Sequence, residues 1–104
     1  MNSPQPSRRA MERFAPHVTH NGAKQRFEAT VDGHVNVAHY VLSDGKLVMT
    51  HTAVHPSLQG RGIAAALVER ALAFAKAEGL KVEPVCSYVR SYLKRHPEHQ
   101  ALAA

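Results

Sequence analysis

The hydrophobic pattern changes its period once, close to residue 59, and this change limits the chain to folds that join a sheet to a long helix. Before that point, short segments such as residues 26–31 alternate apolar and polar side chains between turn residues. After it, Ile63, Leu67 and Ala71 recur at the spacing of one helical face. Since 104 residues leave room for one domain only, sheet and helix must share one core.

Three segments have the pattern of half-buried strands: residues 26–31, 35–41 and 47–54. Asp-Gly pairs at 32–33 and 44–45 separate them and are typical of tight hairpin turns. We therefore expect an antiparallel meander of three strands, or of four if residues 18–20 also pair.

The second half predicts helix, strand and helix. Gly79 ends the long helix, residues 80–83 are compatible with a short strand closed by Pro84, and residues 87–95 form a shorter helix that ends before Pro97. The predicted class is α+β, with a single domain over residues 17–104. Residues 1–16 contain three prolines and three arginines and are expected to form a flexible tail.

Composition narrows the possible partners. Thirteen Lys and Arg against eight Asp and Glu give a formal charge of +5, which suits nucleic acid, an anionic membrane surface or a phosphorylated small molecule. Aromatic residues, at 6%, are few for a protein that stacks single-stranded bases. No apolar run approaches the roughly 18 residues of a membrane span. The single cysteine excludes a disulfide scaffold and predicts a reducing, cytoplasmic location.

Residues 54–64 are the segment most suited to binding a ligand. A strand ends at Pro56, two glycines follow at 60 and 62, and the long helix begins. Glycines let backbone N–H groups approach an anion closely, and the first N–H groups of a helix lack internal partners. Arg61 adds a full positive charge. The sequence thus predicts a phosphate site at a helix N-terminus, although neither the Walker ending nor the G-x-G-x-x-G fingerprint is present.

In this segment, Gln59-x-x-Gly62-x-Ala64 resembles the Q/R-x-x-G-x-G/A signature of the GNAT superfamily of N-acetyltransferases, and Val54-x-Pro56 matches the usual approach to it. Residues 84–98, with Pro84-Val85-Cys86-Ser87-Tyr88-Val89, Tyr92 and His96-Pro97-Glu98, resemble a minimal branch of that superfamily. The resemblance covers residues 24–98. It implies a central mixed sheet whose strands 46–54 and 80–83 splay apart around the pantetheine arm of acetyl-coenzyme A (acetyl-CoA).

The resemblance also implies the reaction, which is transfer of acetyl from acetyl-CoA to a primary amine. Larger members of the superfamily insert helices that shape the acceptor site, and this chain has no room for them. We therefore expect an open acceptor surface for a protein lysine, an N-terminus or a polyamine. The expected acetyl-CoA contacts are Thr52, Ala53, Val54, Gln59, Gly60, Arg61, Gly62, Ile63, Ala64 and Ser87.

Three side chains are candidates for catalysis. Cys86, at a strand-to-helix junction where the helix dipole favours thiolate, either accepts the acetyl group, protonates the leaving thiolate, or is a buried structural cysteine. His51 carries an imidazole, a side chain that suits a base, but alternation also places it beside Leu47 and Met49 as a packed histidine. Tyr92 is close to the sequence position at which many GNAT enzymes carry a tyrosine acid; alternatively, it packs the helix. The surrounding pattern differs from theirs, because Val85-Cys86-Ser87 replaces their common asparagine-containing turn.

The histidine pairs and the basic residues of the C-terminal helix have simpler interpretations. The histidine pairs 51/55, 96/99 and 17/20 lack a third ligand nearby, so we expect no metal. The basic residues Arg90, Lys94 and Arg95 are expected to form a solvated helix face. Two alternatives to an enzyme remain: a non-catalytic CoA or acyl-CoA-binding module, and a small basic nucleic-acid-binding protein. We expect a monomer or a weak dimer.

Overall fold

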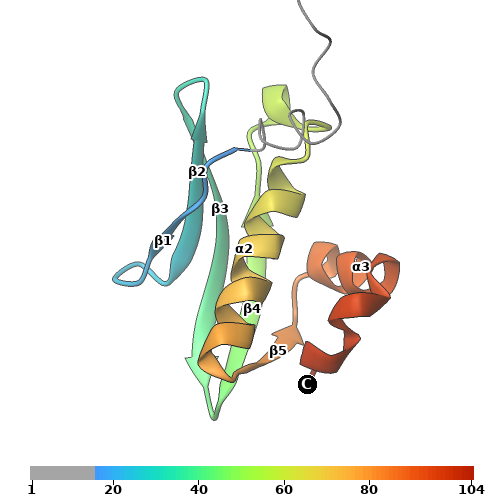
Figure 1. Ribbon diagram of the computed structural model, residues 1–104. Coiled ribbons are helices and arrows are strands. Elements are labelled where there is room, and N and C mark those ends of the chain that lie inside the picture. Colours follow the sequence, from blue (N-terminus) through green and yellow to red (C-terminus); the bar gives the residue numbers. More distant parts are fainter. Residues whose placement is uncertain (1–15) are drawn as a thin grey trace, which may run out of the picture.

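The computed structural model describes residues 16–104, which form a five-stranded sheet in the order β1-β2-β3-β4-β5 (Figure 1). The first four strands pair antiparallel and β5 pairs parallel to β4. This confirms the predicted α+β class and the meander, with β1 as its fourth strand. Of the predicted tail, residues 1–15 lie outside the described residues. The strands are β1 Thr19–Asn21, β2 Arg26–Val31, β3 His34–Ser43, β4 Lys46–Ala53 and β5 Lys81–Pro84.

Both Asp-Gly pairs form the predicted hairpin turns. Asp32 and Gly33 have φ of 50° and 77°, and Asp44 and Gly45 have φ of 49° and 73°. Two central residues with positive φ match the right-handed twist of the strands that a hairpin joins. The two turns lie at opposite ends of the sheet, and the β2–β3 turn is at the same end as the segment that leads into α2 (Figure 1).

The helical segments are η1 Pro56–Leu58, α2 Ile63–Glu78, α3 Ser87–Arg95 and η2 Pro97–Leu102. Helix α2 begins only at Ile63 because Gly60 and Gly62 have φ of 85° and 82°, which right-handed helical backbone does not allow. It ends where predicted, at Gly79, whose φ of 69° caps the last turn. Within residues 16–104 no helix is long and apolar enough to cross a membrane.

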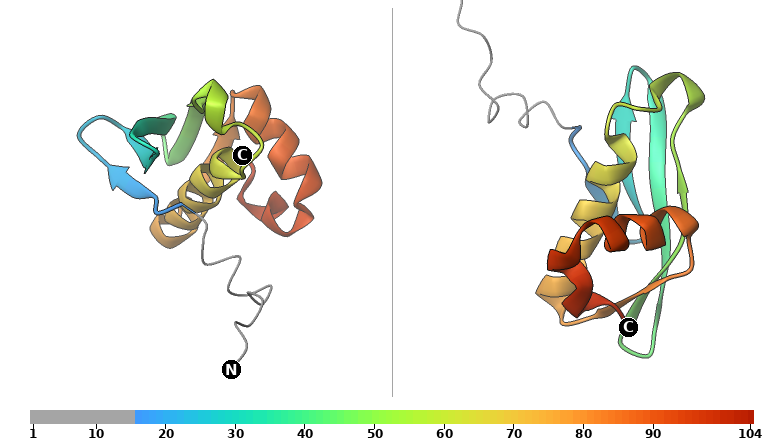
Figure 2. Two further views of the ribbon diagram at one scale, coloured as in Figure 1. Left: turned by 90° about the horizontal axis from the view of Figure 1, so that it is seen from above. Right: turned by 90° about the vertical axis from the view of Figure 1, so that its right-hand side faces the viewer.

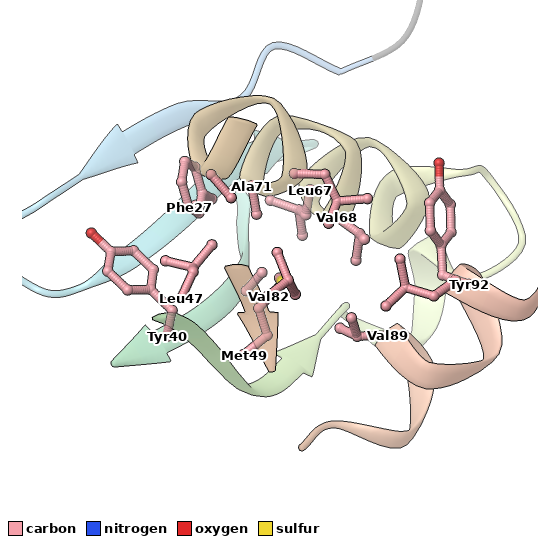
Figure 3. Close-up of a cluster of buried hydrophobic side chains, with 14 of the residues drawn as sticks. Phe27, Tyr40, Leu47, Met49, Leu67, Val68, Ala71, Val82, Val89 and Tyr92 are labelled. Carbon is pink, nitrogen blue, oxygen red and sulfur yellow. The ribbon is translucent and has the colours of Figure 1, made fainter. Parts of the chain in front are cut away.

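The core lies between the sheet, α2 and α3 (Figure 3). Helix α2 packs on one face of the sheet, and α3 lies beside β5 (Figures 1 and 2). The side chains that meet there are nearly or fully inaccessible to solvent, and they include Phe27, Leu47, Met49, Leu67, Val68, Ala71, Val82 and Val89. Val35 and Val41, in contrast, stay 56% and 44% exposed, so the described helices leave part of the sheet uncovered.

A β-bulge in β4 changes which residues face the core. His39 pairs with His51 and Tyr40 with Met49, so Thr50 is an extra residue without a partner. The extra residue shifts the two-residue alternation: Thr52 pairs with the fully buried Ala38, and His51 is exposed. The expectation that His51 shares a side with Leu47 and Met49 is therefore wrong.

Strands β4 and β5 separate beyond Met49, as expected for splayed strands. Their pairing runs only from Lys46 with Lys81 to Met49 with Pro84. The backbone N–H groups of Val85 and Cys86 both donate to the Met49 carbonyl, at 3.1 and 2.9 Å, and the chain then turns into α3. Beyond Met49, β4 pairs with β3 along one edge and with no strand along the other edge.

Candidate functional site

A cavity of about 450 Å³ lies where β4 separates from β5 and where α2 and α3 begin. Seven of the ten expected acetyl-CoA contacts line it: Thr52, Val54, Gln59, Gly60, Gly62, Ile63 and Ala64. Leu58, Ala65, Tyr88 and Arg95 complete the lining. The fold thus brings together the end of a strand, the glycine turn (residues 59–62) and both helices around one hollow.

The glycine turn makes one end of the cavity suitable for an anion. A β-carbon built on Gly60 or Gly62 would meet no atom within 4 Å, so the backbone there borders open space. The first intrahelical hydrogen bond runs from the Ala66 N–H to the Gly62 carbonyl, at 3.0 Å, which leaves the N–H groups of residues 63–65 without helical acceptors. The first turn of α2 contains no acidic residue. Free donors and the helix dipole therefore favour negative charge at this point.

Among residues 16–104, the cation that lines the cavity is Arg95, not Arg61. Arg95 is in the last turn of α3, and the sequence pattern suggested only a solvated helix face for it. Arg61 lies outside the lining, where its guanidinium donates to the Asp32 carboxylate at 3.1 Å. No local signal distinguishes these two arginines, because the orientation of α3 decides which of them reaches the cavity.

Cys86 is the N-cap residue of α3 and is not among the residues that line the cavity, although Thr52, which its thiol contacts, is one of them. Its Sγ donates to the Thr52 Oγ1 at 3.6 Å. Burial raises the pKa of the Cys86 thiol, but the backbone N–H of Val89, the Thr52 hydroxyl and further backbone groups outweigh burial and lower that pKa below its ordinary value. The hydrogen-bond donors around the sulfur therefore favour its thiolate.

The two tyrosines of α3 have different surroundings. Tyr88 lines the cavity, and burial raises the pKa of its hydroxyl while the charge of Arg95 opposes that rise. Tyr92 is 3% exposed, its hydroxyl donates to the Glu69 carboxylate, and its ring stacks on His96 with centroids 4.0 Å apart. Tyr92 therefore joins α3 to α2, and Tyr88 is the tyrosine that a ligand can reach.

Three other predicted residues also lie outside the lining. His51 and Ala53 are exposed, and the His51 ring lies parallel to that of His39 at 6.3 Å. Ser87 is exposed at the first position of α3. Among residues 16–104, no three His, Cys, Asp or Glu side chains are grouped as metal ligands.

Comparison with known proteins agrees with this architecture. Residues 26–102 match the family described as GCN5-related N-acetyl-transferase. Protein NATD1 of Mus musculus and that of Homo sapiens are each 34% identical over 100 residues, which cover 89% of this chain and 88% and 86% of theirs. The solution structure of a GCN5-like putative N-acetyltransferase from Staphylococcus aureus has the same fold, with a TM-score of 0.69, 19% identity, and coverage of 88% of this chain and 90% of that one. The chain therefore belongs to the GCN5-related N-acetyltransferase family.

Proposed function

We propose that this protein is an acetyl-CoA-dependent N-acetyltransferase that acetylates a primary amine on an open acceptor surface. One observation carries the proposal. One cavity is lined both by the helix N-terminus at Gly62, which favours negative charge, and by Thr52, which contacts the Cys86 thiol of lowered pKa. The pyrophosphate and the thioester of acetyl-CoA, at the two ends of its pantetheine arm, match these two features.

The lining suits each part of such a ligand. The N–H groups at the start of α2 and the guanidinium of Arg95 suit phosphate oxygens. Near Thr52, the edge of β4 from which β5 diverges offers backbone groups that β5 leaves unpaired. These groups suit the amides of a pantetheine arm. The formal charge of +5 attracts a ligand with several phosphate charges.

Cys86 can act in two ways. As a thiolate it can attack the thioester carbonyl, so that CoA leaves as its thiol and an acetyl-cysteine passes the acetyl group to the amine. As a thiol it can protonate the departing CoA thiolate while the amine attacks directly. In both routes the attacking amine must lose a proton. The His51 imidazole is not assigned this role, because it is exposed outside the lining of the cavity and the bulge at Thr50 turns it away from the side of Leu47 and Met49.

The acceptor side is open because β1 and β2 are joined by residues 22–25 alone, with no helices between them. An open surface suits a lysine, an N-terminus or a polyamine better than an enclosed metabolite. Tyr92 is not assigned the role of acid because its hydroxyl already donates to Glu69. We also propose a cytoplasmic location, which rests on the single free thiol.

Calorimetric titration with CoA and with acetyl-CoA, followed by intact mass spectrometry, tests this function. We expect binding of both, and an adduct of about 42 Da on wild type but not on Cys86→Ser if the thiol accepts acetyl. Binding without an adduct, with turnover of an amine, indicates direct transfer, whereas binding without turnover indicates a non-catalytic CoA module. Failure to bind either ligand refutes the proposal. Affinity for nucleic acid that falls steeply with salt would then favour the third possibility.

A further inference from the structure

We propose that the β2–β3 hairpin tip positions the glycine turn for phosphate binding. Three of its residues, Asp32, His34 and Asn36, contact the segment that leads from β4 into α2, and we call this set the hairpin clamp. The ligand part of the inference rests on the proposed function. The clamp itself consists of contacts between two segments that the sequence separates by about 20 residues or more (Figure 1).

The first contact is a buried amide. Asn36 is fully inaccessible to solvent, and its Nδ2 donates to the carbonyls of Ala29 and His34 at 3.0 and 3.2 Å. Its Oδ1 accepts the backbone N–H of His55 at 2.8 Å. Because β2 and β3 hold one end of this amide, the other end fixes where the chain leaves β4.

The second contact is a stack of two imidazoles. The rings of His34 and His55 lie 3.7 Å apart between centroids, with an angle of 16° between their planes. The Nδ1 of His55 accepts the Ser57 N–H at 3.1 Å and lies 2.7 Å from the Ser57 Oγ. His55 therefore caps η1, the short helix that enters the glycine turn, and His34 holds that capping ring in its orientation.

The third contact reaches the turn itself. Arg61 lies between the two glycines and donates to the Asp32 carboxylate at 3.1 Å. Both side chains are more than half exposed, so this ion pair alone contributes little, and the buried amide and the stack carry most of the effect. Glycines lose the most conformational freedom on ordering. A turn that is already held at residues 55 and 61 therefore loses less freedom when a phosphate binds.

The test compares two ligands that differ at the phosphate. CoA reaches the glycine turn, whereas acetylpantetheine, without the nucleotide and its phosphates, does not. We expect His34→Ala to weaken CoA affinity about fivefold by loss of the stack, and Asp32→Asn to weaken it about twofold. His34→Phe should restore CoA affinity because it keeps a flat ring. The Michaelis constant for acetylpantetheine should stay unchanged in all three variants.

Asp44→Asn is the matched control. It makes the same change of charge in the same kind of Asp-Gly turn, at the end of the sheet away from the glycine turn. Asparagine tolerates positive φ at both sites, so Asp32→Asn and Asp44→Asn should melt at similar temperatures. Only Asp32→Asn should change CoA affinity.

A second readout needs no ligand: the ¹⁵N order parameters of Gly60 and Gly62 should fall in His34→Ala and recover in His34→Phe. If wild type fails to bind CoA, the proposed function is refuted and these order parameters still decide on the clamp. Equal CoA affinity in wild type and His34→Ala overturns the inference. So does an equal loss for both ligands, or tighter CoA binding by Asp32→Asn, which would mean that Asp32 withholds Arg61 from the phosphate.

Discussion

A carboxylate placed at Gly62 should abolish anion binding and hardly change the stability of the fold. Gly62 is the N-cap of α2 at φ of 82°, and a side chain there points into open space. The backbone strain of a non-glycine residue at this φ costs about 1 kcal/mol. A carboxylate at the positive end of the helix dipole stabilises the fold by about 0.3–1 kcal/mol. The net stability cost of Gly62→Glu is therefore below about 1 kcal/mol.

The effect on binding is much larger. A phosphate charge about 5 Å from the new carboxylate is repelled by about 3 kcal/mol at an effective dielectric constant of 20. This energy corresponds to a loss of affinity of more than hundredfold. Calorimetric titration with CoA at low and at high salt measures the loss, which should shrink as salt screens the repulsion.

Two variants isolate the charge. Gly62→Gln introduces the same strain without the charge, so it should melt about 3 °C below Gly62→Glu and bind CoA far better. Gly79→Glu introduces the same charge at φ of 69°, at the negative end of the same helix. It should be the least stable of the three and should leave CoA affinity unchanged. CoA affinity of Gly62→Glu equal to that of wild type would refute the phosphate site.

Three further outcomes are expected. Because the pKa of Cys86 is lowered, its alkylation by iodoacetamide should accelerate at lower pH than that of a free thiol, and Cys86→Ala should lose turnover but keep CoA affinity. Tyr92→Phe should cost about 1 kcal/mol of unfolding free energy, read by urea denaturation, through loss of its bond to Glu69; its CoA affinity should not change. Burial, and then the charge of Arg70, lower the pKa of His20, so the folded state binds fewer protons than the unfolded state and stability falls as pH drops below about 6.5. His20→Gln should flatten that dependence of melting temperature on pH; an unchanged slope would show that other groups cause it.

The sequence by itself determined the elements and the turns. These features depend on interactions within a few residues: the two-residue alternation, the Asp-Gly pairs and the helical spacing. Such local patterns can be recognised from the sequence alone. The bounds of α3 and the end of α2 at Gly79 were correct for this reason. The position of the glycine turn was also predictable, because a strand end, two glycines and a helical period are consecutive in the chain.

The tertiary structure decided which side chains reach the cavity. The bulge at Thr50 turned His51 away from the expected side, and the orientation of α3 brought Tyr88 and Arg95 to the lining. The Cys86 thiol meets Thr52 across 34 positions, and Arg61 meets Asp32 across 29. Contacts between such distant segments form only when the sheet and helices pack together, so no local pattern of residues encodes them.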